Sequence, residues 1–324
     1  MPLVNFSNLD FIGIKESIKD YLRANSNFTD YDFEGSNLST IVDALAYNTY
    51  ITSYNANMVT NEVFIDSATL RENVVSLARN IGYVPRSRKA ACANVSFSVN
   101  VQNTTAVTVT LNAGAVLTTR SSGVNKNQNF IFSIPNDITV PVDQFGVASF
   151  SNIKVYEGTY ITQTFTVDTA NFNQKFVLPN AGIDTDLLSV VVKDTKDSTV
   201  SRKFALYDSL FDVTASTRSY FVQEIAQERY QLLFGDGVFG EKLENMNYIE
   251  ANYIVTSGAT GNNITNFTFI GNLTSNNGKT LSSGVSVVTT DLVSRGGKPI
   301  ESVESVKKYA PQIYASQNRA VTAA

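Results

Sequence analysis

Apolar residues near the N-terminus recur with the period of a helix. Between residues 11 and 22 they lie three or four positions apart, at Phe11, Ile14, Ile18, Tyr21 and Leu22. This spacing is typical of one face of an amphipathic helix. The four residues from Ser7 to Asp10 precede it with the sequence form of a capping box. A polar stretch at 25–35 interrupts the pattern, and its composition predicts a hinge.

A second, longer helix is predicted after this stretch. Ser36 and Asn37 are both suitable N-caps, because their side chains accept hydrogen bonds from the free N–H groups of a first turn. The apolar pattern continues as far as Met58 and Val59. The predicted helix is therefore unusually long for a globular protein.

A third helix is predicted from Asp66 or Ser67 to residue 81. Gly82 suits the left-handed position that commonly follows a helix, and Pro85 prevents continuation. The segment Pro85–Ala90 that follows is predicted to be a second hinge, again on composition alone.

From residue 90 the pattern changes to strict alternation of polar and apolar residues. The run 94–101 alternates in this way, and 107–111 repeats it, as expected for half-buried strands. Similar short runs separated by Gly, Asn, Asp and Pro continue to about residue 192. We predict an antiparallel sandwich or barrel-like module over 90–200, followed by a second strand-rich stretch to about 290.

The last part of the chain returns to a helical pattern. Glu301 and Glu304 come early and Lys307 and Lys308 come late, which matches the dipole of a helix. Pro311 is predicted to interrupt this helix. Because the chain ends with no stop signal or polar tail, we expect it to be the front part of a longer protein.

These patterns predict an α+β protein. It has an N-terminal helical arm or bundle, antiparallel β-rich modules and a short helical C-terminal segment. The predicted domains are a helical assembly domain at 1–89, a β-rich domain at 90–200, a second β-rich region at 201–298, and a helical segment at 299–324 that begins a further domain.

The composition removes several kinds of chemistry. The chain has no histidine, which excludes Ser-His-Asp or Cys-His catalysis and His-ligated zinc. One cysteine cannot form an intrachain disulfide. The net charge is −4 (25 basic and 29 acidic residues) and the basic residues form no cluster, so no nucleic-acid partner is expected. No apolar run is long enough for a membrane helix. We expect no catalytic residues, no metal and no cofactor.

The most distinctive segment is Phe-Gly-Asp-Gly-Val-Phe-Gly at 234–240. Its Asp-Gly pair predicts a tight turn, because such turns need a positive φ that glycine adopts without cost. A metal or phosphate loop is the functional alternative, but the further ligands of a calcium loop are missing. We therefore interpret the segment as a structural hairpin turn formed by Phe234, Gly235, Asp236, Gly237 and Gly240.

The second predicted helix has apolar and aromatic residues on more than one face. Such a helix is either central in a core or covered by a partner. Packing against the β region of the same chain and bundling between subunits both remain open. For the second alternative, the candidate partner interface consists of Leu38, Ile41, Val42, Leu45, Tyr47, Tyr50, Ile51, Tyr54 and Met58.

Several blocks of this sequence resemble one known family. They are Leu38–Tyr50, Asn61–Val74, Ala78–Pro85, Phe234–Gly240 with Tyr253 and Gly258–Asn262, and Ala310–Thr322. In this order they are similar to the baseplate wedge proteins (gene product six) of T-even-type contractile-tailed phages, within the wider baseplate J-like family.

This resemblance implies a structural, non-enzymatic role in the tail baseplate of a virion that is assembled in the host cytoplasm. Its implied partners are a second copy of the chain, a larger wedge subunit, a small wedge protein with a lysozyme-like fold, and neighbours in the tail hub and sheath. The pairs are expected to form an inner ring around the hub and to help transmit the baseplate rearrangement to sheath contraction.

A different class of protein also fits the composition. β-domains rich in Asn, Thr, Ser and Tyr are typical of adhesins and tail-fibre modules that bind glycans or a host surface. The N-terminal helices distinguish the two hypotheses, because an adhesin needs them only as an anchor, whereas a wedge subunit needs them as its main interface.

Overall fold

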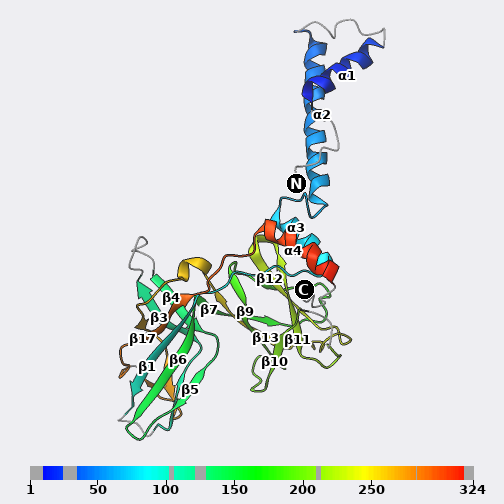
Figure 1. Cartoon of the computed structure of the whole chain (residues 1–324). Helices are drawn as coiled ribbons and strands as arrows, with labels where there is room; N and C mark the ends of the chain where they lie inside the picture. The colour runs from blue at the N-terminus through cyan, green and yellow to red at the C-terminus, as the bar shows by residue number, and fades with distance from the viewer. Residues whose placement is uncertain are drawn as a thin grey trace. The chain divides into compact units, whose positions relative to one another are not determined.

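We describe the chain from a computed structural model (Figure 1). The structure describes residues 10–24, 35–101, 106–120, 129–208, 213–281 and 283–316. The polypeptide forms two compact units. The helical unit joins the residues up to Tyr83 to those from Val303 onward, and the β unit comprises Val84–Ser302.

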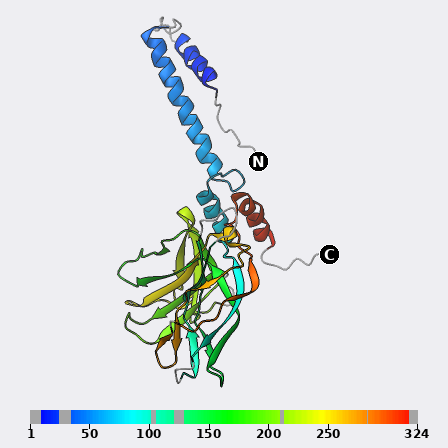
Figure 2. The ribbon, with the colours of Figure 1, turned by 90° about the vertical axis from the view of Figure 1, so that its left-hand side faces the viewer.

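The helical unit begins with two helices of unequal length that lie side by side (Figure 2). Helix α1 spans Phe11–Arg23 and helix α2 spans Asn37–Glu62. Ser36 caps α2 through its Oγ, which accepts a hydrogen bond from Ser39 N at 3.0 Å, so the prediction of a long helix starting here is confirmed. Asp10 caps α1 by the same means, whereas Ser7 and nearly all of the predicted hinge at 25–35 lie outside the described residues.

Helices α3 (Arg71–Asn80) and α4 (Val303–Ser316) pack together around a small apolar core. The predicted end of α3 is confirmed: Gly82 has a φ of +81°, and Tyr83 N–H donates to Ala78 O as in a Schellman motif. The predicted interruption at Pro311 is wrong, because α4 continues through it. Val306 and Ala310 are completely buried in the core with α3, and this burial stabilises the helix around the proline.

The β unit contains three antiparallel or mixed sheets. The first has the order β14-β3-β4-β6-β1-β17 and the second the order β16-β15-β2-β5. Their strands are β1 (Cys92–Asn100), β2 (Thr108–Leu111), β3 (Gly114–Arg120), β4 (Asn129–Ile134), β5 (Ile138–Pro141), β6 (Val147–Glu157), β14 (Thr268–Phe269), β15 (Leu273–Ser275), β16 (Thr280–Leu281) and β17 (Thr289–Arg295).

The third sheet has the order β7-β13-β9-β10-β11-β12-β8. Its strands are β7 (Thr159–Thr166), β8 (Phe176–Leu178), β9 (Ile183–Lys193), β10 (Ser201–Leu206), β11 (Ser219–Ile225), β12 (Arg229–Phe234) and β13 (Tyr248–Val255). A turn with left-handed residues at Gln227 and Glu228 lies at Ala226–Glu228, and a short 3₁₀ turn lies at Gly258–Gly261. The predicted α+β fold is confirmed.

The two apolar cores of this unit do not follow the predicted boundary at residue 200. One core combines residues 93–155 with 264–288, because β17 returns to pair with β1. The other combines residues 161–255, and here β9 and β10 are neighbours, with Phe204 opposite Val190. The predicted boundary at 200/201 therefore falls between two paired strands of the same sheet. Alternation identifies each strand, but it does not say with which strand it pairs.

Candidate interaction surface on the helical unit

Helix α2 exposes apolar side chains along its length. Its 26 residues span about 39 Å at 1.5 Å per residue. The exposed fraction is 55 % for Ile41, 52 % for Leu45 and 67 % for Val59. Ile41 and Val59 point in the same direction, since they lie five turns apart at 3.6 residues per turn. Apolar side chains near both ends of α2 therefore remain open to a partner.

These residues belong to a regular line on the helix. Steps of four and three residues connect Ile41, Leu45, Asn48, Thr52, Asn55 and Val59, and all six side chains are exposed. We call this line the seam. The spacing is that of the contact positions in a coiled coil, where polar residues at some positions specify register and the number of helices.

The seam lies on a helix that is almost free of charge. Within α2 only Asp43 and Glu62 are charged. Asp43 forms a 2.5 Å ion pair with Lys15 of α1. Repulsion between charges therefore does not oppose the approach of another helix.

The nine predicted interface residues divide into three groups. Ile41, Leu45, Tyr47 and Tyr54 are exposed, whereas Leu38, Tyr50, Ile51 and Met58 are partly buried. Val42 is 1 % exposed, so it belongs to the packing of the chain itself and is a correction to the predicted set. The prediction omitted Val59, although the helical period that links it to Ile41 was visible in the sequence.

The end of α2 is fixed by the carboxylate of Glu62. It accepts hydrogen bonds from Thr69 N (2.8 Å), from Thr69 Oγ1 (2.5 Å), from Leu70 N (3.3 Å) and from Asn73 Nδ2 (2.8 Å). Partial burial raises the pKa of this carboxyl, but the hydrogen bonds outweigh that effect and lower it to about 2. Glu62 thus caps the N-terminus of α3 from the preceding helix.

This arrangement corrects the predicted start of α3. We expected the helix to begin at Asp66 or Ser67, but its N-cap is Leu70, which provides no side-chain cap. The capping group instead comes from Glu62, and a residue so far from the helix start is not recognised by a local capping pattern.

The segment at 234–240 is a turn, but it does not connect two paired strands. Strand β12 pairs with β11 and β8, whereas β13 pairs with β7 and β9, so the predicted hairpin is wrong. Asp236 Oδ1 accepts from Val238 N and Phe239 N, both at 2.8 Å, and these bonds lower the pKa of its carboxyl. This closes a local turn of the kind that Asp often forms.

The glycines of this turn are required by geometry. Gly237 and Gly240 have φ values of +94° and +91°. A Cβ on Gly235 would lie 2.2 Å from the carbonyl carbon of Gly240. Phe234 ends β12 and packs in the second core. The segment therefore has a structural explanation that needs no ligand.

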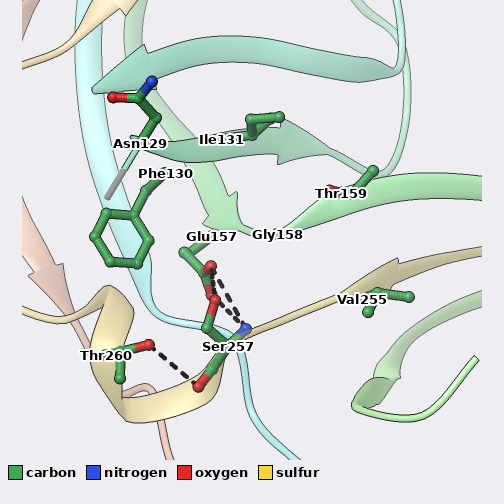
Figure 3. A pocket seen from close by; sticks show the side chains of 9 residues that line it. All are labelled: Asn129, Phe130, Ile131, Glu157, Gly158, Thr159, Val255, Ser257 and Thr260. Atoms are coloured by element: carbon green, nitrogen blue, oxygen red, sulfur yellow. Dashed lines mark hydrogen bonds between the residues drawn. The ribbon is translucent and has the colours of Figure 1, made fainter. Parts of the chain in front are cut away.

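A cleft of about 460 Å³ lies beside the end of β6, where the chain passes into β7 (Figure 3). Its one buried acid is Glu157, and both carboxylate oxygens are already occupied. Thr256 Oγ1 donates to Oε2 at 2.6 Å, and Ser257 Oγ donates to Oε1 at 2.7 Å. Glu157 therefore connects β6 to the segment after β13. The carboxylate in this cleft has a structural role.

Two further features are absent from the part of the chain that the structure describes. No group of three or more acidic, Cys or His side chains is arranged there to hold a metal ion. None of the helices described is both long enough and apolar enough to cross a membrane.

Comparison with known proteins assigns the helical unit. Residues 10–83 match the family model "Baseplate wedge protein gp6-like, helical domain". This segment is therefore similar to the helical domain of gp6-like baseplate wedge proteins. Its end coincides with the boundary of the helical unit at Tyr83, and the predicted resemblance to baseplate wedge proteins is confirmed.

The similarity extends over the β unit as well. The chain is 23 % identical to "Baseplate wedge protein gp6" of Enterobacteria phage T4 over 97 % of its length, and covers 48 % of that protein. The chain thus spans about half the length of this relative. A solved structure of the baseplate of the anti-feeding prophage is similar over 96 % of this chain and 54 % of that one, with 16 % identity and a TM-score of 0.33.

Proposed function

We propose that the chain is a structural subunit of a contractile-tail baseplate and that the seam of α2 is an assembly interface. The match to a gp6-like helical domain, and the similarity of 97 % of the chain to about half of a T4 baseplate wedge protein, support the baseplate role. The observation that supports the interface is the seam, a line of exposed side chains that runs along α2 from Ile41 to Val59.

The occupant of the seam is an apolar helix of the same kind. Ile41, Leu45 and Val59 provide contacts near the two ends of the seam, and burying them stabilises a complex at roughly 25 cal/mol per Å² of apolar area. The amides and the hydroxyl in the middle restrict the partner to a helix that places polar groups opposite them. A second copy of the chain meets this condition, because its own seam has the same amides and hydroxyl in the middle. Another wedge subunit is the alternative occupant.

We infer a finer role from the resemblance to baseplate wedge proteins. The subunits pair and form an inner ring around the tail hub, in contact with a larger wedge subunit, a small wedge protein of lysozyme-like fold and the sheath end of the tail. The ring then passes the rearrangement of the baseplate to sheath contraction. A role of this kind needs no catalysis. The chain also has no histidine, the residue that most often acts as a general acid or base.

The substitution Leu45→Asp tests the interface. A carboxylate in the apolar part of this contact would be buried without a partner, so association through the seam should weaken at least tenfold. Light scattering behind size exclusion measures self-association over a range of concentrations. Co-purification with co-expressed wedge proteins of the same phage measures association with other subunits.

The matched control is Val287→Asp. Val287 is 87 % exposed and lies in the β unit, so this change adds the same charge away from the seam. It should leave both assays unchanged. A folded Leu45→Asp chain that associates as the wild type does, with itself and with the other wedge proteins, contradicts the proposed interface.

A further inference from the structure

The chain passes between its two units twice, and the two connecting segments are paired. Lys89 N donates to Lys298 O at 3.0 Å, and Lys298 N donates back to Lys89 O at 3.0 Å. Closer to the boundary, Glu301 N donates to Arg86 O at 3.1 Å. Residues 86–89 and 298–301 thus form a short antiparallel ribbon inside the β unit.

The ribbon is closed by a buried carboxylate. Glu301 Oε2 accepts a hydrogen bond from Arg86 N at 2.9 Å, and the Glu301 side chain is 1 % exposed. The Arg86 guanidinium contributes little, because its Nε is 3.8 Å from this oxygen and its side chain is 71 % exposed. Of the two groups of Arg86, the backbone N–H is therefore the one that binds this carboxylate.

The first connecting segment is also fastened to the third sheet. Asp184 Oδ2 accepts from Ala90 N at 2.8 Å, and Ser87 Oγ accepts from Thr185 N at 3.1 Å. Asp184 is buried. These bonds hold the backbone on both sides of Arg88, so the segment predicted to be a hinge at Pro85–Ala90 is bonded along most of its length.

The second connecting segment is held in a similar way. Asn262 Nδ2 donates to Gly297 O at 3.0 Å, and Gly297 N donates to Asn262 Oδ1 at 2.9 Å. A Cβ on Gly297 would lie 2.3 Å from Gly258 O, so the backbones approach too closely for any other residue. Both segments are thus fixed on the β unit before they reach the boundary.

We propose that these two segments form a clamp, closed by the Glu301 carboxylate on the Arg86 N–H, which keeps the two crossings of the chain paired within the β unit. The inference does not depend on the identity of any assembly partner. It concerns a conformational device in the fold, and the isolated chain is sufficient to test it.

Amide hydrogen exchange of the full chain provides the first test. The clamp requires that the amides of Lys89 and Lys298 exchange slowly in the wild type. Glu301→Ala leaves the Arg86 N–H without its acceptor, and we expect both amides to exchange at least tenfold faster. Arg86→Ala keeps that N–H, so we expect less than a threefold change.

Glu304→Ala is the matched control, because Glu304 is close in sequence but 86 % exposed. It should not change the exchange of either amide. The clamp is refuted by fast exchange at both positions in the wild type, or by an effect of Arg86→Ala as large as that of Glu301→Ala.

A cross-link tests the same pairing if Glu301→Ala fails to fold. Lys89 and Lys298 face each other as a hydrogen-bonded antiparallel pair, whose Cα atoms lie about 5.5 Å apart. That distance suits a disulfide. In a Cys92→Ser background, Lys89→Cys with Lys298→Cys should oxidise almost completely under mild conditions, whereas Lys89→Cys with Lys279→Cys should not. Equal oxidation of the two pairs would show that the connecting segments move freely.

Discussion

Replacing Glu62 by glutamine should weaken the connection between α2 and α3. The change keeps the shape of the side chain but removes its charge, and it replaces one of two accepting oxygens by an NH₂ donor. The three residues that donate to Glu62 are Thr69, Leu70 and Asn73, and they then share a single neutral acceptor. Two of the four donor groups are backbone N–H groups that lead into α3, and that of the N-cap residue Leu70 has no partner within the helix.

The size of the effect follows from the pKa. A decrease from 4.5 to about 2 corresponds to about 3.4 kcal/mol of stabilisation of the charged form. Glu62 is only partly buried, so solvent screening reduces this upper value. Loss of an N-cap costs about 0.5–2 kcal/mol in other helices. We expect Glu62→Gln to lower the free energy of unfolding of the helical unit by about 1–2 kcal/mol at pH 7.

The effect should depend on pH in a defined direction. The folded pKa lies below the unfolded one, so the contribution of Glu62 is complete above about pH 4.5 and is lost as the pH falls through about 2. Urea unfolding followed by circular dichroism, at pH 7 and at pH 2.5, compares the variant with the wild type. The difference between them should be largest at pH 7.

The control is Glu16→Gln, which removes a carboxylate from an exposed position of α1. It should change the free energy of unfolding by less than about 0.5 kcal/mol. If Glu62→Gln is neutral at pH 7, or if its effect is as large at pH 2.5, then the carboxylate does not cap α3 and the reasoning is refuted.

Two further substitutions test the β unit. Gly237→Val forces a β-branched residue into a φ of +94° and should destabilise the turn by about 1–3 kcal/mol; an unchanged melting temperature would show that the turn does not need this conformation. Glu157→Ala leaves Thr256 and Ser257 without their buried acceptor and should cost about 2–4 kcal/mol. Calorimetry measures this second loss, and Thr159→Ala at the rim of the same cleft, which should be nearly neutral, is its control.

The sequence predicted well whatever depends on neighbouring residues. The cap at Ser36, the length of α2 and the left-handed Gly82 all follow from local patterns. The individual strands could be predicted equally well, since the alternating run 94–101 corresponds to β1 (Cys92–Asn100). In each of these cases the determining interactions lie within a few residues of one another.

The differences arise where distant residues decide the structure. The start of α3 depends on Glu62 of the preceding helix, and the continuation of α4 through Pro311 depends on packing against α3. The pairing of β17 with β1 connects residues that are almost 200 positions apart. For the interaction surface, the sequence identified the helix. Only the structure shows that Ile41 is exposed and available to a partner, whereas its neighbour Val42 is buried within the chain.

The near absence of charge on α2 has a consequence for how fast the subunit is incorporated. Electrostatic steering raises association rates well above the ordinary range of about 10⁵–10⁶ M⁻¹s⁻¹, and it acts through opposite charges on the approaching surfaces. Asp43 is already paired with Lys15, and Glu62 is occupied by α3. The seam therefore offers no such attraction, and its encounters should be insensitive to salt. The rate at which α2 associates with its partner then depends on the concentrations of the two subunits.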